Sequence, residues 1–125
     1  MFRRLALSAL LAVLTPMSAY ADTAFNDAVL RYEINMKNVE VQVTGAATQA
    51  QLGQHAAACT ALKEAIKSYD YALDSLDMAE NAPFDPADKP RPTKDQFEGA
   101  RHDIRDKKAM FAPIVEESCN RAKLK

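Results

Sequence analysis

The sequence is poor in the residue types that most catalytic and cofactor-binding sites require. It has no tryptophan, two histidines, two cysteines and three glycines among 125 residues. So few glycines leave little room for a loop that cradles phosphate groups. The sequence also lacks a Gly-x-Ser-x-Gly elbow and a Cys-x-x-Cys-His site for covalent haem. We therefore expect a protein that is not an enzyme and that carries no cofactor.

The chain also lacks an excess of charge of either sign. Lysine and arginine together number 16 and the acidic residues 17, so the formal net charge is −1. A strongly basic balance would favour nucleic acid, and its absence predicts that this protein binds none. Apolar residues make up 48% of the chain and charged residues 26%, which is typical of one soluble globular domain.

No apolar run in the sequence is long enough to cross a membrane, which takes about 20 residues. The run Leu5–Leu14 instead follows Arg3 and Arg4, and Ala19–Ala21 places small residues where a signal peptidase cuts. No cysteine follows that run, so a lipid anchor is not indicated. We expect residues 1–21 to be a signal peptide. The remaining chain is then an exported protein, periplasmic or alternatively extracellular, and not an integral membrane protein.

The expected mature chain has one pair of cysteines, Cys59 and Cys119. An even pair in an oxidising compartment predicts a disulfide bond. The bond would close a loop of about 60 residues, which the chain-entropy model values at about 4 kcal/mol. A domain this small has a modest core and benefits from such a covalent link.

Residues 22–125 read as a single helical domain. The patterns predict helices at about 24–44, 47–80 and 93–124, with Gly45 as a helix stop and a stiff proline-rich loop at 81–92. Gly53 marks either the true start of the second helix or a bend in it. Short connections make successive helices antiparallel neighbours. The predicted fold is therefore all-α, a small antiparallel three-helix bundle with one disulfide after removal of the signal peptide.

Two local signals refine the third helix. Thr93 and Gln96 have the spacing of a capping box, which satisfies free amides at a helix start. Pro113 lies inside the same segment and should kink or interrupt the helix near Ala112.

Apolar residues recur in steps of three and four along each helical segment, which predicts the buried seams. The first seam is Phe25, Val29, Tyr32, Met36, Val39 and Val43; the second is Leu52, His55, Cys59, Leu62, Ile66, Tyr69, Leu73 and Leu76; the third is Phe97, Ala100, Ile104, Phe111, Val115, Cys119 and Ala122. Such a heptad-like seam can also hold two copies together, so a dimer is an alternative to a monomer.

Three features predict one register between the second and third helices. In an antiparallel pair of helices, the residue numbers of two facing positions add up to a constant. The sums for the cysteine pair, the pairs of opposite charge and the apolar pairs differ from one another by at most two. The facing pairs are Cys59–Cys119, Asp77–Arg101, Asp74–Arg105, Asp70–Lys108, Leu62–Val115, Ile66–Phe111 and Leu73–Ile104.

The remaining candidate residues suggest binding rather than catalysis. Phe84 lies in the proline-rich loop, where it either anchors a partner protein or caps the bundle core. His55 stands on the second seam, where it either packs beside the disulfide or contacts a ligand held between helices, with Tyr69 or Tyr32 as further polar tips. His55 and Cys59 have chelating spacing, but two ligands are too few for a metal site.

Two classes of function follow. The first is an exported binding protein for an unknown protein partner or client, such as an inhibitor, an immunity factor, an adaptor or a stress chaperone. The alternative is a periplasmic carrier of a small ligand, haem or metal. Haem would need a pair of axial ligands such as Met36 and His102, and His102 is expected to lie on the surface.

Overall fold

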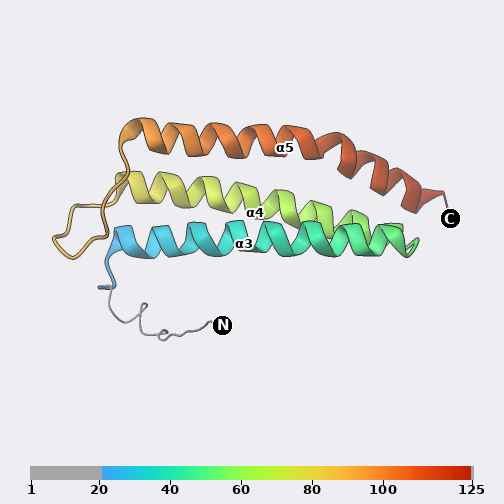
Figure 1. The fold of residues 1–125 in the computed structure, drawn as a ribbon, viewed down its shortest axis with the longest axis horizontal. Helices are drawn as coiled ribbons and strands as arrows, with labels where there is room; N and C mark the ends of the chain where they lie inside the picture. Colours follow the sequence, from blue (N-terminus) through green and yellow to red (C-terminus); the bar gives the residue numbers. More distant parts are fainter. Residues whose placement is uncertain (1–20, 125) are drawn as a thin grey trace, which may run out of the picture.

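The computed structural model describes residues 21–124, which form three helices in an antiparallel order (Figure 1). These are α3 (Ala24–Gln51), α4 (His55–Asn81) and α5 (Lys94–Lys123). The predicted all-α three-helix bundle with one disulfide is confirmed. Residues 1–20 of the predicted signal peptide lie outside the described part.

The helix ends follow from local chemistry, which the prediction placed correctly at α5 and wrongly between α3 and α4. Thr93 caps α5, and its hydroxyl accepts from Gln96 N while the Gln96 side chain accepts from Thr93 N, as the capping box predicts. Gly45, by contrast, does not stop α3, because an interior glycine costs only about 1 kcal/mol and buried Ala46 next to it packs on α4. The turn comes at Gly53, whose φ of 75° is the left-handed conformation that glycine adopts freely.

The contact between α3 and α4 is made on α4 by small residues that the seam prediction missed. Alanines and serines recur every three or four residues along this side of α4 and are buried: Ala58, Ala65, Ser68, Ala72, Ser75 and Ala79. The alanines among them share two core clusters with buried residues of α3, among which are Phe25 and Ala28. Small side chains let two helix backbones approach closely, and the contact between α3 and α4 is more extensive than that between α4 and α5.

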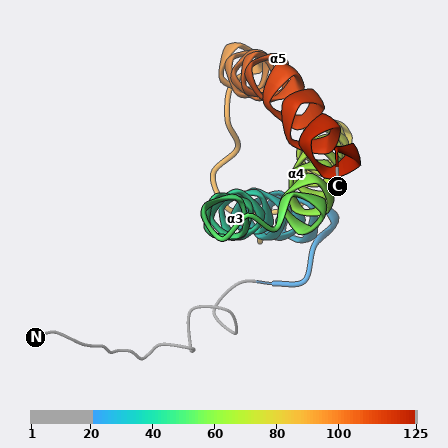
Figure 2. The ribbon, with the colours of Figure 1, turned by 90° about the vertical axis from the view of Figure 1, so that its right-hand side faces the viewer.

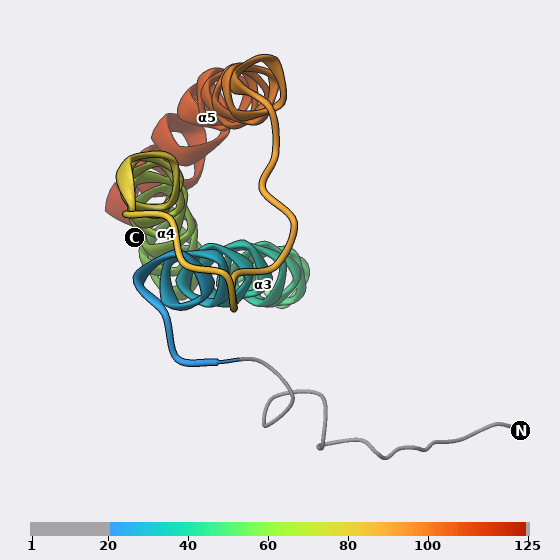
Figure 3. The same ribbon diagram turned by 90° about the vertical axis from the view of Figure 1, so that its left-hand side faces the viewer.

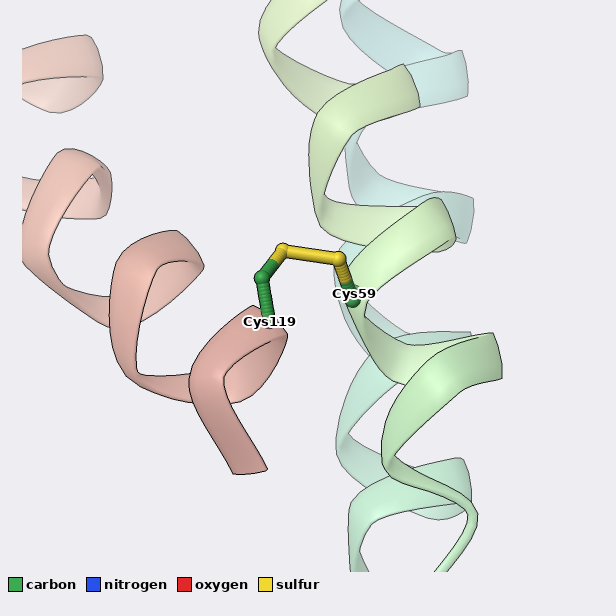
Figure 4. The surroundings of a disulfide bond; sticks show 2 residues. All are labelled: Cys59 and Cys119. Atoms are coloured by element: carbon green, nitrogen blue, oxygen red, sulfur yellow. A yellow bond between two sulfur atoms is a disulfide. The ribbon is translucent and has the colours of Figure 1, made fainter. Parts of the chain in front are cut away.

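α5 packs on an adjacent side of α4, in the predicted register. The Cys59–Cys119 disulfide joins the two helices with a Cα–Cα distance of 4.8 Å (Figure 4). Arg101 and Lys108 form ion pairs with Asp77 and Asp70, as the facing pairs require. The apolar seam agrees, because its members pack in the same two clusters. The third charge pair is wrong: within residues 21–124, Asp74 and Arg105 form no ion pair, since both side chains extend into solvent.

α3 and α5 lie on two sides of α4 and hardly contact each other, as the two end-on views show (Figures 2 and 3). Phe25 and Val39 of the first predicted seam are buried, but its other four residues are consequently only half-buried: Val29, Tyr32, Met36 and Val43. The bundle is thus open along one side of α4, where α3 and α5 would meet in a closed bundle.

Pro113 bends α5 without ending it, and the C-terminal part of the helix inclines toward α4 (Figure 1). A proline inside a helix removes one backbone hydrogen bond and clashes with the preceding turn. The fully buried side chains of α5 all precede this bend: Phe97, Arg101 and Ile104. Beyond it, the disulfide at Cys119 is the main link between α5 and the rest of the protein.

Candidate functional site

The connection between α4 and α5, residues 82–93, is called the proline loop here because it contains four prolines. It crosses the start of α3 before it returns to α5 (Figure 3). Proline fixes φ at about −65° and so restricts the loop before any contact is made. Three polar side chains then fasten it: Asn26 of α3 and the loop's own Asp88 and Arg91.

Asn26 fastens the middle of the loop to the start of α3. This side chain is buried, and its Nδ2 donates to Ala87 O at 3.2 Å and to Ala21 O at 2.9 Å. Its Oδ1 accepts from Lys89 N at 2.9 Å. A buried amide whose donors and acceptor are all paired specifies one position for the backbone it holds.

Asp88 and Arg91 brace the loop from inside. The Thr23 hydroxyl donates to Asp88 Oδ1 at 2.6 Å, while Arg91 Nη2 and Asp85 N donate to Asp88 Oδ2 at 2.9 and 3.1 Å. These hydrogen bonds, led by that from Thr23, stabilise the carboxylate and lower the pKa of Asp88 despite some opposing burial. Arg91 also lies 4.6 Å from the centre of the Phe25 ring, a cation–π contact.

The Arg91 side chain also binds two backbone carbonyls at the start of the loop. It donates to Ala82 O at 2.9 Å and to Pro83 O at 2.7 Å. Those two carbonyls directly precede Phe84, so the same guanidinium that holds Asp88 also fixes the position from which the phenyl ring projects. The proline loop is therefore a preorganised segment rather than a slack linker.

Phe84 stands out from this fastened loop with 78% of its surface exposed. The interpretation in which Phe84 caps the bundle core is wrong, because the core end is already covered by Phe25 and Arg91. Its position fits the other interpretation, a partner anchor, which stays a prediction. The sequence showed the aromatic and the prolines, but it could not show that Arg91 covers the core in place of Phe84.

The second candidate, His55, is half-buried at the start of α4 and lines an apolar pocket of about 420 Å³. The lining comes from all three helices: Val43, Ala46, Ala47, Ala50, His55, Ala58, Leu62, Phe111, Ile114, Glu117, Ser118 and Arg121. Tyr69 and Tyr32, the other predicted polar tips, are not in this lining. Tyr69 is buried against Phe111, and this burial raises the pKa of its phenol, while Tyr32 lines a second pocket of about 370 Å³.

The possible haem ligands are not brought together. His102 lies on the outside of α5, where its side chain is 78% exposed and its Nε2 is 3.1 Å from Asp106 Oδ2. Met36 packs against the core from α3. His102 is therefore a surface residue, as expected. Among residues 21–124, no group of three or more metal-binding side chains is found, and no helix is long and apolar enough to cross a membrane.

Arg101 forms the most elaborate ion-pair cluster among the described residues, but its role is structural. It is buried and donates to Asp77 Oδ1 at 2.9 Å, to Glu98 Oε2 at 3.0 Å and to Glu80. The hydrogen bond that Arg101 donates to Glu80 contributes most to raising the pKa of Arg101. The sequence predicted the partner Asp77 and missed the other two. All three acids satisfy one cation, so the cluster joins α4 to α5.

Comparison of the chain with models of protein families, with curated proteins and with solved structures gives no match. The function has to be argued from the geometry of the chain itself.

Proposed function

We propose that this chain is a small exported protein that binds a partner protein through the proline loop, with Phe84 as the anchor. The observation that carries the proposal is the contrast between the loop and its aromatic residue. Asn26, Asp88 and Arg91 all fasten the loop, yet Phe84 is 78% exposed. Large aromatic side chains that enter a partner's pocket contribute most of the energy of many interfaces.

The rigidity of the loop supports this use of Phe84. Binding through a mobile loop costs free energy because the loop must be ordered, and a preorganised loop avoids most of that cost. A fixed aromatic fits a partner of fixed shape. Among the expected classes, this favours an inhibitor, an immunity factor or an adaptor over a chaperone, which needs an adaptable apolar surface.

The compartment belongs to the same proposal. The predicted signal peptide motivates export, and the Cys59–Cys119 disulfide fits an oxidising compartment. The intact mass of the protein from the native exported fraction tests this part. We expect the mass of residues 22–125 less two hydrogens. A mass that retains residues 1–21 would contradict export with processing.

Replacement of the anchor tests the binding part. Phe84→Ala should weaken retention of the partner by at least tenfold, because an aromatic anchor contributes about 2 kcal/mol or more. It should shift the free energy of unfolding by less than about 0.5 kcal/mol, since the ring is exposed. The matched control is Leu124→Ala, another exposed apolar residue, which caps the C-terminal end of α5.

Partner retention is measured by passing the native exported fraction over the immobilised wild-type protein and each variant. A Phe84→Ala variant that keeps its partner would contradict the proposal. A variant that loses both its partner and its stability would also contradict it, because the ring would then be structural.

A further inference from the structure

The apolar pocket at the turn between α3 and α4 carries an inference that does not depend on Phe84. Its volume of about 420 Å³ lies within the range of about 300–1,000 Å³ that is usual for small-molecule sites. Three buried residues form its floor: Ala46, Ala58 and Leu62. Its walls are also apolar, because Val43 of α3 and Phe111 and Ile114 of α5 belong to the lining. An alkyl chain is the chemistry that such a surface binds.

The rim of the pocket is polar and offers donors. Arg121 and His55 belong to the lining, and so does Ser118, whose hydroxyl oxygen is buried and has no hydrogen-bond partner among residues 21–124. Buried polar groups are nearly always paired, so an unpaired hydroxyl in a pocket wall points to a partner from outside. Glu117 is the acidic member of the rim, and it is already paired with Arg121 Nη2 at 2.8 Å. An arginine has five N–H donors, so this contact leaves others available.

The start of α4 adds further donors on the same side. Its N-cap, Gln54, makes no side-chain cap, so the first amides of the helix lack the acceptor that a serine or aspartate would supply. Free amides and the helix dipole both favour a negative group at this position, next to His55. The second pocket has no such rim, because its only charged lining residue is Glu33.

From this arrangement we infer that the pocket binds a single-chain amphiphile with an anionic head group, such as a fatty acid. The alkyl chain lies between α3 and α5 over Leu62, and the carboxylate meets Arg121, Ser118 and the start of α4. The open side of the bundle, which α5 leaves uncovered on α3, is the entry path.

The test titrates the purified, disulfide-bonded protein with dodecanoate and with dodecyltrimethylammonium by calorimetry. We expect saturable one-to-one binding of dodecanoate, and binding of the ammonium compound that is at least tenfold weaker. Decanoate should bind roughly tenfold more weakly than dodecanoate, because each buried methylene contributes about 0.8 kcal/mol. Absence of saturable binding, or equal binding of both head groups, would overturn the inference.

Two variants and one control locate the site. Ala47→Trp fills the pocket from an exposed position of its lining and should abolish binding. The control Ala109→Trp introduces the same ring at an exposed position of α5 outside the lining and should leave binding unchanged. Arg121→Gln, at a position where the side chain is 57% exposed, should reduce the preference for dodecanoate over the ammonium compound by about fivefold or more.

Each contrary outcome of these variants overturns a stated part of the inference. Equal losses in both tryptophan variants would mean that the pocket is not the site. An unchanged head-group preference in Arg121→Gln would refute the assigned role of Arg121. A dimer that Ala47→Trp dissociates, seen by native mass spectrometry, would assign the pocket to a second copy of this chain and exclude the amphiphile.

Discussion

Removal of the disulfide should detach the end of α5 and leave the α3–α4 pair folded. The perturbation is Cys59→Ala together with Cys119→Ala. After Ile104, no side chain of α5 is fully buried, and only partly buried residues such as Phe111 and Val115 remain on its packed side. The disulfide is therefore the strongest constraint on this part of the helix.

The magnitude follows from the length of the closed loop. Cys59 and Cys119 are 60 residues apart, for which the chain-entropy model gives about 4 kcal/mol of lost stability. The total stability of small domains is about 5–15 kcal/mol, so the loss is a large share of it. The α3–α4 contact, with its buried small residues on α4, should retain most of the remainder.

Urea unfolding followed by circular dichroism measures the loss, and amide hydrogen exchange locates it. We expect exchange to accelerate most in residues 106–124 and least in α3 and in the half of α4 that faces it. A loss below about 1 kcal/mol would refute the entropic argument. Acceleration of equal size in all three helices would refute the claim that α5 is held separately.

The other predictions concern single residues. Gly53→Ala should destabilise the protein by about 1 kcal/mol, because its φ of 75° is strained for any residue with a Cβ. Gly45→Ala should stabilise it by about 0.5–1 kcal/mol, because Gly45 lies inside a helix and an added Cβ meets nothing within 4 Å. Urea midpoints measure both changes. The folded-state pKa of Asp88 is lowered from 3.8, so its contribution is complete above about pH 4 and is lost as the pH falls through the folded value. Asp88→Asn should therefore reduce the loss of stability between pH 5 and pH 2, and Asp74→Asn, at an exposed carboxylate, should not; thermal unfolding across that range compares them. Arg101→Ala should lower the free energy of unfolding by about 1–3 kcal/mol, because three carboxylates lose one shared cation; an unchanged unfolding curve would contradict this role.

The sequence predicted the parts of the fold that depend on local chemistry and on large residues. The capping box at Thr93 needs only residues three apart, so its signal is complete in the sequence. The register of α4 and α5 was recoverable because charges, cysteines and large apolar residues all mark the same alignment. The bend in α5 was likewise predictable, because a proline inside a helix is visible in the sequence.

The missed features depend on contacts that no short pattern contains. Alanines and serines such as Ala72 and Ser75 carry weak hydropathy, so the side of α4 that packs most closely on α3 was not recognised. Gly45 and Gly53 are both candidates for the boundary between the first two helices, and only the backbone path shows that Gly53 is the one with a positive φ. An apolar seam in the sequence does not show which neighbouring helix covers it. Only the structure shows that α5 leaves one side of α3 uncovered.

In the candidate site, too, single residues were predictable from the sequence, but their surroundings were not. His55 was singled out by its place on a seam, but the pocket around it needs Arg121 and Ser118, which lie more than 60 residues away in the chain. Phe84 was singled out by its prolines, but its exposure depends on Arg91 covering Phe25. Long-range contacts of this kind are set by the whole fold.

The most direct test of the central claim is photocross-linking from position 84. A photoreactive phenylalanine replaces Phe84, and the matched control carries it at position 124, in place of the exposed Leu124. Irradiation in the native exported fraction should give one discrete adduct from position 84 and none from position 124. Excess wild-type protein should suppress that adduct, and excess Phe84→Ala protein should not. Equal labelling from both positions, or no adduct from position 84, would contradict the claim that the proline loop binds a partner protein.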